Sequence, residues 1–240
     1  WVAHSTGFHV SKLRASDGAL IGLYPAGAVI KYPTEVTFNG THILVIHERQ
    51  SIGGKWLSVL LPTDGSLVSM NPLNDPLGGM VSAGPHIWGR TGGRPSGAVE
   101  AFNMSGQKVI HRAVRDFTDL DYASPTDLLF DGENIWVTVS DNGYYESATV
   151  NDPRVRPRGN TGIPGTDVVL KLRATDGSVL GAYPVGESGG FGQWWNEPEG
   201  RHVGYAKDLA FDGTHIWVAL RRDNTVVKLR ASDGTILGTY

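Results

Sequence analysis

The sequence of 240 residues contains no cysteine, no long apolar run and no large excess of one charge. The lack of cysteine excludes disulfides, thiolate metal sites and thiol catalysis. Because a run of about 18 apolar residues is needed to span a bilayer, no segment is expected to insert into a membrane. A formal net charge of -3 creates no field that would attract nucleic acid, so we expect no nucleic-acid partner.

Turn residues are what the sequence has in quantity, with 32 glycines and 13 prolines, and they recur in two phrases. One phrase reads "FDGENIWVT" and "FDGTHIWVA", with its glycine at positions 40, 84, 132 and 213. The other reads "KLRASDGALIG", "KLRATDGSVLG" and "KLRASDGTILG", with its glycine at positions 18, 65, 106, 177 and 234. Since β-branched and aromatic runs lie between these turns, each copy is predicted to hold four short antiparallel strands, A to D.

Five copies of such a unit predict an all-β fold, a five-bladed β-propeller of four-stranded antiparallel blades. We expect a single domain over residues 1–240. The first copy begins at strand B with Trp1 and has no strand A. Because an open edge leaves backbone donors unpaired, we expect the given chain to be a fragment of a longer polypeptide, or a partner to supply the strand.

The phrases "IWVTVSDN" and "IWVALRRDNTVVKLRASDGTILGTY" resemble the bacterial β-propeller repeats of the YVTN and streptogramin (virginiamycin B) lyase-like type. The resemblance covers nearly the whole chain and implies the propeller fold. For the lyases it also implies a histidine and a glutamate near the central channel with a magnesium ion. Where the lyases carry "WFTE" and "GPHG", this chain reads "LVIH" or "WVTV" and "PTEV" or "PTDL".

The fourth copy carries two insertions. Its first and second turn glycines, Gly132 and Gly177, are 45 residues apart, against 21 to 25 in the other copies with both turns. The connection that leaves it, from Gly177 to Gly213, is also long, at 36 residues against 19 to 26. In a four-stranded meander the B-to-C and D-to-A connections lie at the same end, so both insertions are predicted to share one face of the domain.

Exposed aromatics mixed with charges suit a recognition surface for a protein or for sugar rings stacked on indoles. The insertions, within residues 138–166 and 184–205, offer such side chains. The candidate binding residues are Tyr144, Tyr145, Arg154, Arg156, Arg158, Trp194, Trp195, Glu197, Glu199, Arg201 and His202. An alternative interpretation is that Trp194 and Trp195 pack the two insertions on each other, because large aromatics are usually buried.

A second hypothesis concerns the channel mouth. Glu35 begins strand A and His47, twelve residues later, ends strand B of the second copy, so the two are expected to lie roughly opposite one another in an antiparallel hairpin. His4 holds the position equivalent to His47 in the first copy. A carboxylate with imidazoles there could hold a divalent metal such as Mg²⁺ or Ca²⁺, or act as general acid and base. The structural alternative is that carboxylates at strand starts accept hydrogen bonds from nearby loop amides.

The sequence favours a non-enzymatic binding or scaffolding module without a cofactor, whose partner is a protein or a glycan. We expect it outside the cytoplasm, as a secreted, periplasmic or cell-surface protein. The alternative is a metal-assisted lyase or hydrolase with catalytic residues Glu35, His47 and His4.

Overall fold

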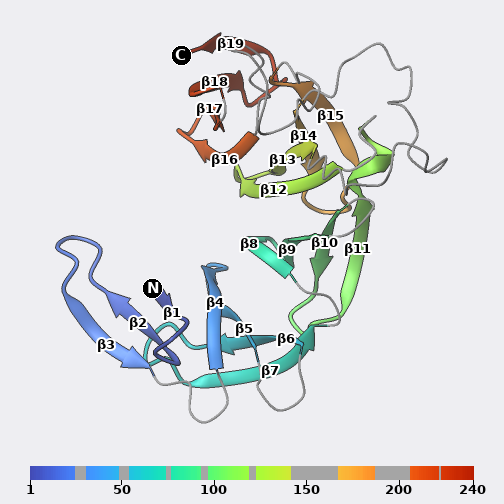
Figure 1. Ribbon diagram of the computed structural model, residues 1–240. Helices are drawn as coiled ribbons and strands as arrows, with labels where there is room; N and C mark the ends of the chain where they lie inside the picture. Colours follow the sequence, from blue (N-terminus) through green and yellow to red (C-terminus); the bar gives the residue numbers. More distant parts are fainter. Residues whose placement is uncertain are drawn as a thin grey trace, which may run out of the picture. The chain divides into compact units, whose positions relative to one another are not determined.

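The computed structural model describes residues 1–24, 31–48, 54–73, 77–92, 97–118, 123–141, 167–186, 206–221 and 223–240. In these ranges almost every regular element is a β-strand, and the one helix described is the short 3-10 turn η1 (Val114–Asp116). The strands form antiparallel sheets in which neighbours in sequence are neighbours in space (Figure 1). This arrangement confirms the predicted all-β meanders.

The chain divides into two compact units, the first comprising Trp1–Thr91 with Glu100–His111. Two sheets lie wholly within it: β1-β2-β3 and β4-β5-β6-β7. The strands of the first sheet are β1 (Val2–His4), β2 (His9–Leu13) and β3 (Leu20–Tyr24). Those of the second are β4 (Lys31–Phe38), β5 (Ile43–Glu48), β6 (Lys55–Leu60) and β7 (Leu67–Leu73).

A third sheet has the order β11-β10-β9-β8, and its last two strands in sequence contain residues of both units. Its strands are β8 (Leu77–Ala83), β9 (His86–Thr91), β10 (Ala98–Phe102) and β11 (Lys108–Ala113).

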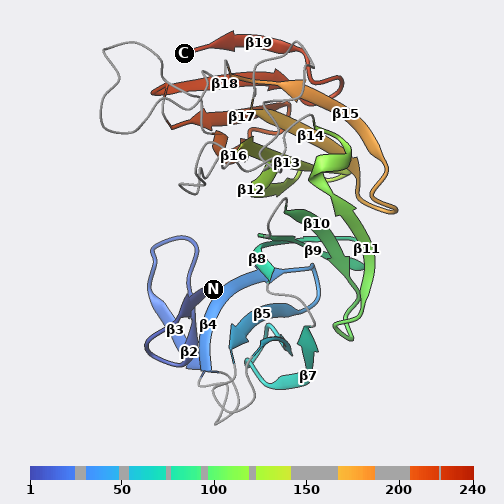
Figure 2. The ribbon, with the colours of Figure 1, turned by 45° about the vertical axis from the view of Figure 1, so that its right-hand side comes forward.

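The second unit comprises Gly92–Val99 with Arg112–Tyr240 and holds two complete four-stranded sheets (Figure 2). One sheet contains β12 (Ala123–Phe130), β13 (Asn134–Asp141), β14 (Val168–Arg173) and β15 (Val179–Pro184). The other contains β16 (Ala206–Phe211), β17 (His215–Leu220), β18 (Thr225–Arg230) and β19 (Ile236–Thr239). The two predicted insertions therefore fall between β13 and β14 and between β15 and β16.

The tight turns form because an aspartate and a glycine occupy fixed places in them. In the turn between β14 and β15, the Asp176 carboxylate accepts the Ser178 backbone N–H at 2.8 Å. Gly177 follows with a φ of 70°, which a residue with a side chain adopts only at a cost. Hydrogen bonds from the backbone and hydroxyl of Ser178 lower the pKa of Asp176 to about 2.

Hydrophobic cores form where consecutive sheets pack face to face. We call the side of β1–β3 that carries Trp1, Val10, Lys12 and Tyr24 its tryptophan face. We call the side of β4–β7 that carries Val45, His47, Ser58 and Leu60 its valine face. Trp1 and Val10 pack with Ile43, Val45 and Leu60 in one cluster, so a tryptophan face covers the valine face that follows it.

The second unit repeats this packing. From β12–β15, Trp136, Val169 and Tyr183 join one core with Val218, Val227 and Leu229 of β16–β19. Equivalent positions of the repeat therefore make equivalent contacts in the two units, and each such contact buries one face of each sheet.

The first sheet has three strands rather than four, as expected from a first copy without strand A. Within the described ranges, β1 pairs with β2 and with no other strand. No helix among the described residues is long and apolar enough to cross a membrane. The prediction of one domain over residues 1–240 stays a prediction.

Candidate functional site

The ends of both insertions meet in a cluster of buried polar groups in the second unit, which we call the root cluster. Asp167, just before β14, accepts the backbone N–H of Ala206 at 2.7 Å through its carboxylate. Its backbone carbonyl accepts the N–H of Val185 at 2.9 Å. Asp167 thus joins the end of one insertion to both ends of the other.

Hydroxyl groups complete the root cluster from the other side. Ser140, at the end of β13, donates from Oγ to the Ala206 carbonyl at 3.0 Å. Thr126 Oγ1 lies 2.7 Å from the same carbonyl and 2.7 Å from Thr138 Oγ1. All of these side chains are buried. In a low-dielectric interior such bonds are strengthened, so the cluster fixes the four points where the insertions join the sheets.

The predicted binding residues themselves lie outside the described residues. Residues 142–166 include Tyr144, Tyr145, Arg154, Arg156 and Arg158. Residues 187–205 include Trp194, Trp195, Glu197, Glu199, Arg201 and His202. The described part of the site is therefore its base, the root cluster, which the sequence reasoning did not single out. The sequence did contain a signal for this cluster, because the polar residues Ser140 and Asp167 lie close to the two ends of the first insertion.

The three channel-mouth residues each have a protein partner. His4 Nε2 lies 2.8 Å from Ser11 Oγ, and the His4 ring stacks on His9 with centroids 4.4 Å apart. His47 is fully buried, with Nε2 2.9 Å from Ser58 Oγ. Both serines were missed from sequence, although each lies on strand C opposite a valine of strand B in the same register.

The strand register separates Glu35 from His47. Glu35 pairs with Ile46, and His47 pairs with Pro33, because β4 has irregularities on both sides of Pro33. Since neighbouring residues of a strand point to opposite faces, the Glu35 and His47 side chains face different sheets. The expectation that they lie opposite one another is therefore wrong. In the described ranges, no three His, Asp or Glu side chains are grouped so as to hold a metal ion.

Glu35 instead holds consecutive sheets together. Its Oε1 accepts the backbone N–H of Gly79 on β8 at 3.3 Å. Asp127, the equivalent residue of β12, accepts the N–H of Leu209 on β16 at 2.9 Å. These bonds are those of the structural alternative drawn from the sequence, with the amides supplied by strands rather than loops.

A further polar group lies on the third sheet, where sequence reasoning proposed nothing. Glu100 is almost fully buried, and its Oε1 lies 2.7 Å from His111 Nδ1 and 3.0 Å from Lys108 Nζ. Its Oε2 is buried with no hydrogen-bond partner among the described groups. The Lys108 ammonium and the His111 imidazole, both on β11, are thus the polar partners of this buried carboxylate, and a buried carboxylate needs such partners.

Comparison with known proteins identifies the fold class. No protein-family model and no curated protein sequence matches the chain. Among solved structures it is similar to hydrazine synthase of Kuenenia stuttgartiensis, with a TM-score of 0.60 and 17% identity over 95% of this chain and 60% of that one. The chain thus spans less than two thirds of that relative.

Two further structures give the same result. A 6-phosphogluconolactonase-like protein of Bacteroides uniformis has a TM-score of 0.56 and 12% identity, over 96% of this chain and 62% of that one. The quinohemoprotein alcohol dehydrogenase ADHIIG of Pseudomonas putida has a TM-score of 0.56 and 14% identity, over 97% of this chain and 39% of that one. These neighbours are β-propeller-like, and at such identities the likeness shows a β-propeller type of fold and nothing about activity.

Proposed function

We propose that this chain is a non-enzymatic binding or scaffolding β-propeller that recognises a protein or a glycan through the two insertions of its fourth repeat. The observation that carries the proposal is the root cluster. Asp167, Ser140 and Thr126 hold the ends of both insertions with buried hydrogen bonds at 2.7 to 3.0 Å. A rigid base of this kind is what a recognition surface made of loops needs in order to be preorganised.

The insertions have a composition that fits this role. They contain adjacent tryptophans, adjacent tyrosines and an Arg-x-Arg-x-Arg run, residue types enriched where binding energy concentrates. The opposite end of the same sheet has only tight turns, so the repeat has been elaborated at one end. We further propose that the repeats form five blades of the YVTN and streptogramin lyase-like type, in an extracytoplasmic protein without a cofactor.

The channel-mouth residues support the non-enzymatic form of the proposal. The metal-assisted lyase or hydrolase would need His4, Glu35 and His47 to converge on one ion. His4 and His47 are instead engaged with Ser11 and Ser58, and Glu35 with a backbone amide. The hydrogen bonds of these three side chains are therefore made to groups of the fold itself, which is the pattern of residues with a structural role.

The test uses a defined glycan array and a displayed peptide library, both probed with the purified chain. We expect a selected ligand to bind the wild type and to lose at least tenfold in affinity in the Trp194→Ala, Trp195→Ala double variant. The matched control is Arg14→Ala with Arg230→Ala, which removes two exposed arginines from the tight turns. If the double variant keeps the affinity, or if the control loses it equally, the insertions are not the binding surface.

A further inference from the structure

The turn between β4 and β5 differs by one residue from the turn between β16 and β17. The first reads "FNGTHI" and the second "FDGTHI", so Asn39 stands where the second turn has Asp212. The turn between β12 and β13 also has an aspartate, Asp131, at this place. The glycines that follow, Gly40 and Gly213, have φ of 94° and 95°. The first two turns therefore share a backbone conformation and differ in having an amide or a carboxylate.

The side chain of Asn39 is folded back over its own turn. Its Oδ1 accepts the backbone N–H of Thr41 at 3.0 Å and that of His42 at 2.7 Å. Thr41 Oγ1 donates to the same oxygen at 3.0 Å, and His42 Nδ1 lies 2.9 Å from that hydroxyl. Three donors on one carbonyl oxygen stabilise the negative charge that this oxygen gains when a nucleophile attacks its carbon. The amide carbon, Cγ of Asn39, is thus prepared for attack.

A nucleophile lies next to this carbon in the chain. The backbone nitrogen of Gly40 is two bonds from Cα of Asn39, so a bond between that nitrogen and Cγ closes a five-membered ring. Gly40 is exposed, and a β-carbon added to it would meet nothing within 4 Å. Neither a side chain on Gly40 nor a neighbouring group therefore hinders the approach of the two atoms or the entry of water.

We propose that Asn39 is a site of spontaneous deamidation, which places an aspartate in this turn. The Gly40 nitrogen bonds to Cγ of Asn39 while the bond from Cγ to Nδ2 breaks. Nδ2 leaves as ammonia together with the proton that the Gly40 nitrogen gives up. Water then adds to Cγ of the cyclic imide and breaks its bond to nitrogen, which restores the Gly40 N–H and leaves a carboxyl group. Water is the only other reactant.

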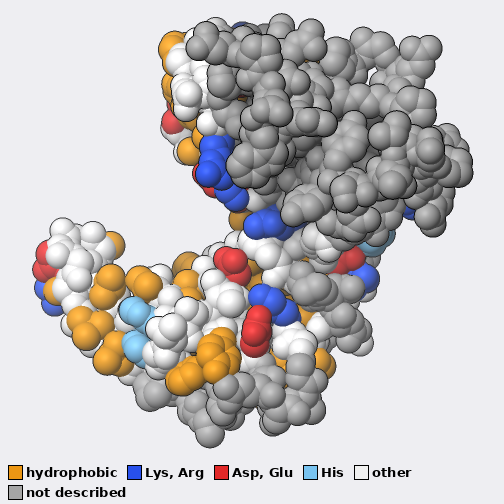
Figure 3. All heavy atoms as spheres, in the orientation of Figure 1, with side chains coloured by type: hydrophobic (Ala, Val, Ile, Leu, Met, Phe, Trp, Pro, Cys, Tyr) orange, Lys and Arg blue, Asp and Glu red, His pale blue; other side chains and the backbone are white. Residues whose placement is uncertain are grey.

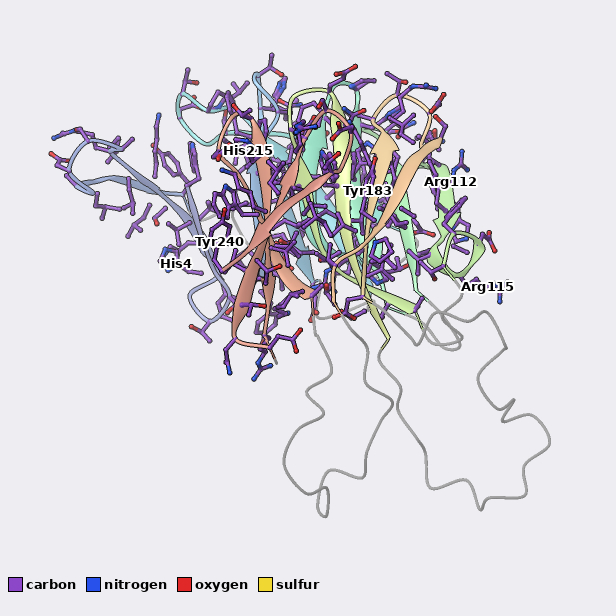
Figure 4. All side chains as sticks on the ribbon, turned by 90° about the horizontal axis from the view of Figure 1, so that it is seen from above. His4, Arg112, Arg115, Tyr183, His215 and Tyr240 are labelled. Atoms are coloured by element: carbon purple, nitrogen blue, oxygen red, sulfur yellow. The ribbon has the colours of Figure 1, made fainter. Side chains whose placement is uncertain are left out.

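The conformation of the turn suits the product. In the turn between β16 and β17, Asp212 Oδ1 accepts the N–H groups of Thr214 and His215 at 2.9 and 2.7 Å, as Asn39 Oδ1 does in its own turn. Asp212 Oδ2 lies 3.1 Å from Nδ1 of His215, which is labelled in Figure 4. Because His42 holds the position of His215, a carboxylate at position 39 gains an imidazole partner.

The product loses one contact of the amide. Asn39 Nδ2 donates to Sδ of Met104 at 3.8 Å, and a carboxylate oxygen cannot donate. A thioether is a weak acceptor, so the loss is small. In Asp131 the equivalent oxygen accepts an indole N–H at 2.7 Å, whereas Leu44 holds the tryptophan position here. Figure 3 shows acidic and basic side chains interspersed on the surface of the first unit, so the added negative charge meets no field of its own sign.

Asn103, in the turn between β10 and β11, is an internal control. Its Oδ1 accepts the N–H groups of Ser105 and Gln107, both at 3.0 Å, and the Ser105 hydroxyl at 2.7 Å. The residue that follows it is Met104, whose side chain hinders the approach of the backbone nitrogen to Cγ. Asn103 thus has three donors on its amide oxygen without an accessible nucleophile, and we expect it to stay intact.

The experiment incubates the purified chain at mildly alkaline pH and follows each asparagine by peptide mass spectrometry. We expect Asn39 to convert to the acid roughly tenfold faster than Asn103, or more. Aspartate and isoaspartate at position 39 both count as conversion, because they arise from opening the same imide at its two carbonyls. Asn39→Gln, which would need a larger ring, should not convert. Asn142, which also precedes a glycine, is followed in the same digest as a reference for an Asn-Gly pair.

A second measurement tests the fit of the product. The Asn39→Asp variant should have the same isoelectric point as the converted chain and should melt no lower than the wild type. If Asn39 stays intact as long as Asn103 while Asn142 converts, the turn protects its amide and the proposal is overturned. An Asn39→Asp variant that melts well below the wild type would equally overturn it, because the turn would then reject the carboxylate.

Discussion

The sheet β12–β15 ends in exposed tight turns at one end and in the buried root cluster at the other, and aspartate serves both. Asp176 caps its turn in solvent, where the charge remains hydrated. Asp167 is buried to 2% exposure and accepts the backbone N–H of Ala206. The same side chain therefore shapes a local turn in one place and ties together segments 39 residues apart in the other.

The stability of the fold depends more on a single polar group at the buried end than at the exposed end. An exposed turn that loses its aspartate can replace the hydrogen bonds with water. A buried amide that loses its acceptor has no substitute, and the desolvation cost remains. Substitutions at the two ends of this sheet should therefore have unequal effects.

The largest effect is expected from Asp167→Ala. The change leaves the buried Ala206 N–H without its acceptor, which we expect to lower the free energy of unfolding by about 2–3 kcal/mol. Urea denaturation followed by tryptophan fluorescence measures it. The matched change at the other end, Asp176→Ala, should cost less than half as much. Equal losses at the two positions would mean that the root cluster adds no stability beyond that of an ordinary turn.

Thr126→Val comes next, because it keeps the shape of the side chain and removes the hydroxyl. That hydroxyl bridges Thr138 Oγ1 and the Ala206 carbonyl. We expect a loss of about 1–2 kcal/mol in the same denaturation experiment. Thr126→Ser retains the hydroxyl and serves as the control. A serine variant as unstable as the valine variant would assign the effect to the methyl group rather than to the bond.

A smaller effect is expected at Asp131, in the turn between β12 and β13. Its carboxylate accepts the Trp136 indole N–H at 2.7 Å and backbone N–H groups of the turn. Asp131→Asn keeps an oxygen for the turn and removes the acceptor for the indole, so we expect a loss of about 0.5–1.5 kcal/mol.

The third sheet supplies the comparison for that change. Trp88 holds the repeat position of Trp136, but Ala83 stands in the position of Asp131. The buried Nε1 of Trp88 has no acceptor among the described groups. The tryptophan itself thus persists without the bond. Thermal unfolding of Asp131→Asn that matches the wild type within error would show that the indole hydrogen bond is dispensable in both sheets.

The smallest loss of stability per residue is expected when the pH is lowered and the turn aspartates are protonated. Hydrogen bonds from Ser178 and Thr235 lower the pKa of Asp176 and Asp233 to about 2, from an ordinary value of 3.8. A carboxylate with a depressed pKa contributes stability above its unfolded pKa and loses it as the pH falls through its folded pKa. The melting temperature should therefore decline between about pH 4 and pH 2. In the Asp176→Asn, Asp233→Asn double variant, this part of the decline should be absent.

Much of the fold could be predicted from the sequence because the repeat is local. The turns at Gly132, Gly177 and Gly213 follow from Asp-Gly pairs that set the backbone within a few residues. The apolar alternation between them then fixes which side of each strand is buried. The position of the insertions followed from counting residues between these glycines.

The candidate sites were harder to predict because they depend on register and on contacts between sheets. Counting placed Glu35 opposite His47, but irregularities on either side of Pro33 shift the pairing by one residue and send the two side chains to opposite faces. The Asp167 contact with Ala206 spans the whole of β14 and β15 and an insertion, so no local pattern could reveal it.

The strands, the turns and the end of the sheet that carries the insertions could be read from the sequence, because each depends on residues near one another in the chain. Which polar groups are buried together at the root cluster, and which sheet faces pack against each other within each unit, became visible only in the folded structure. Burial and hydrogen-bond satisfaction depend on partners brought together by packing, and a linear pattern does not contain those distances.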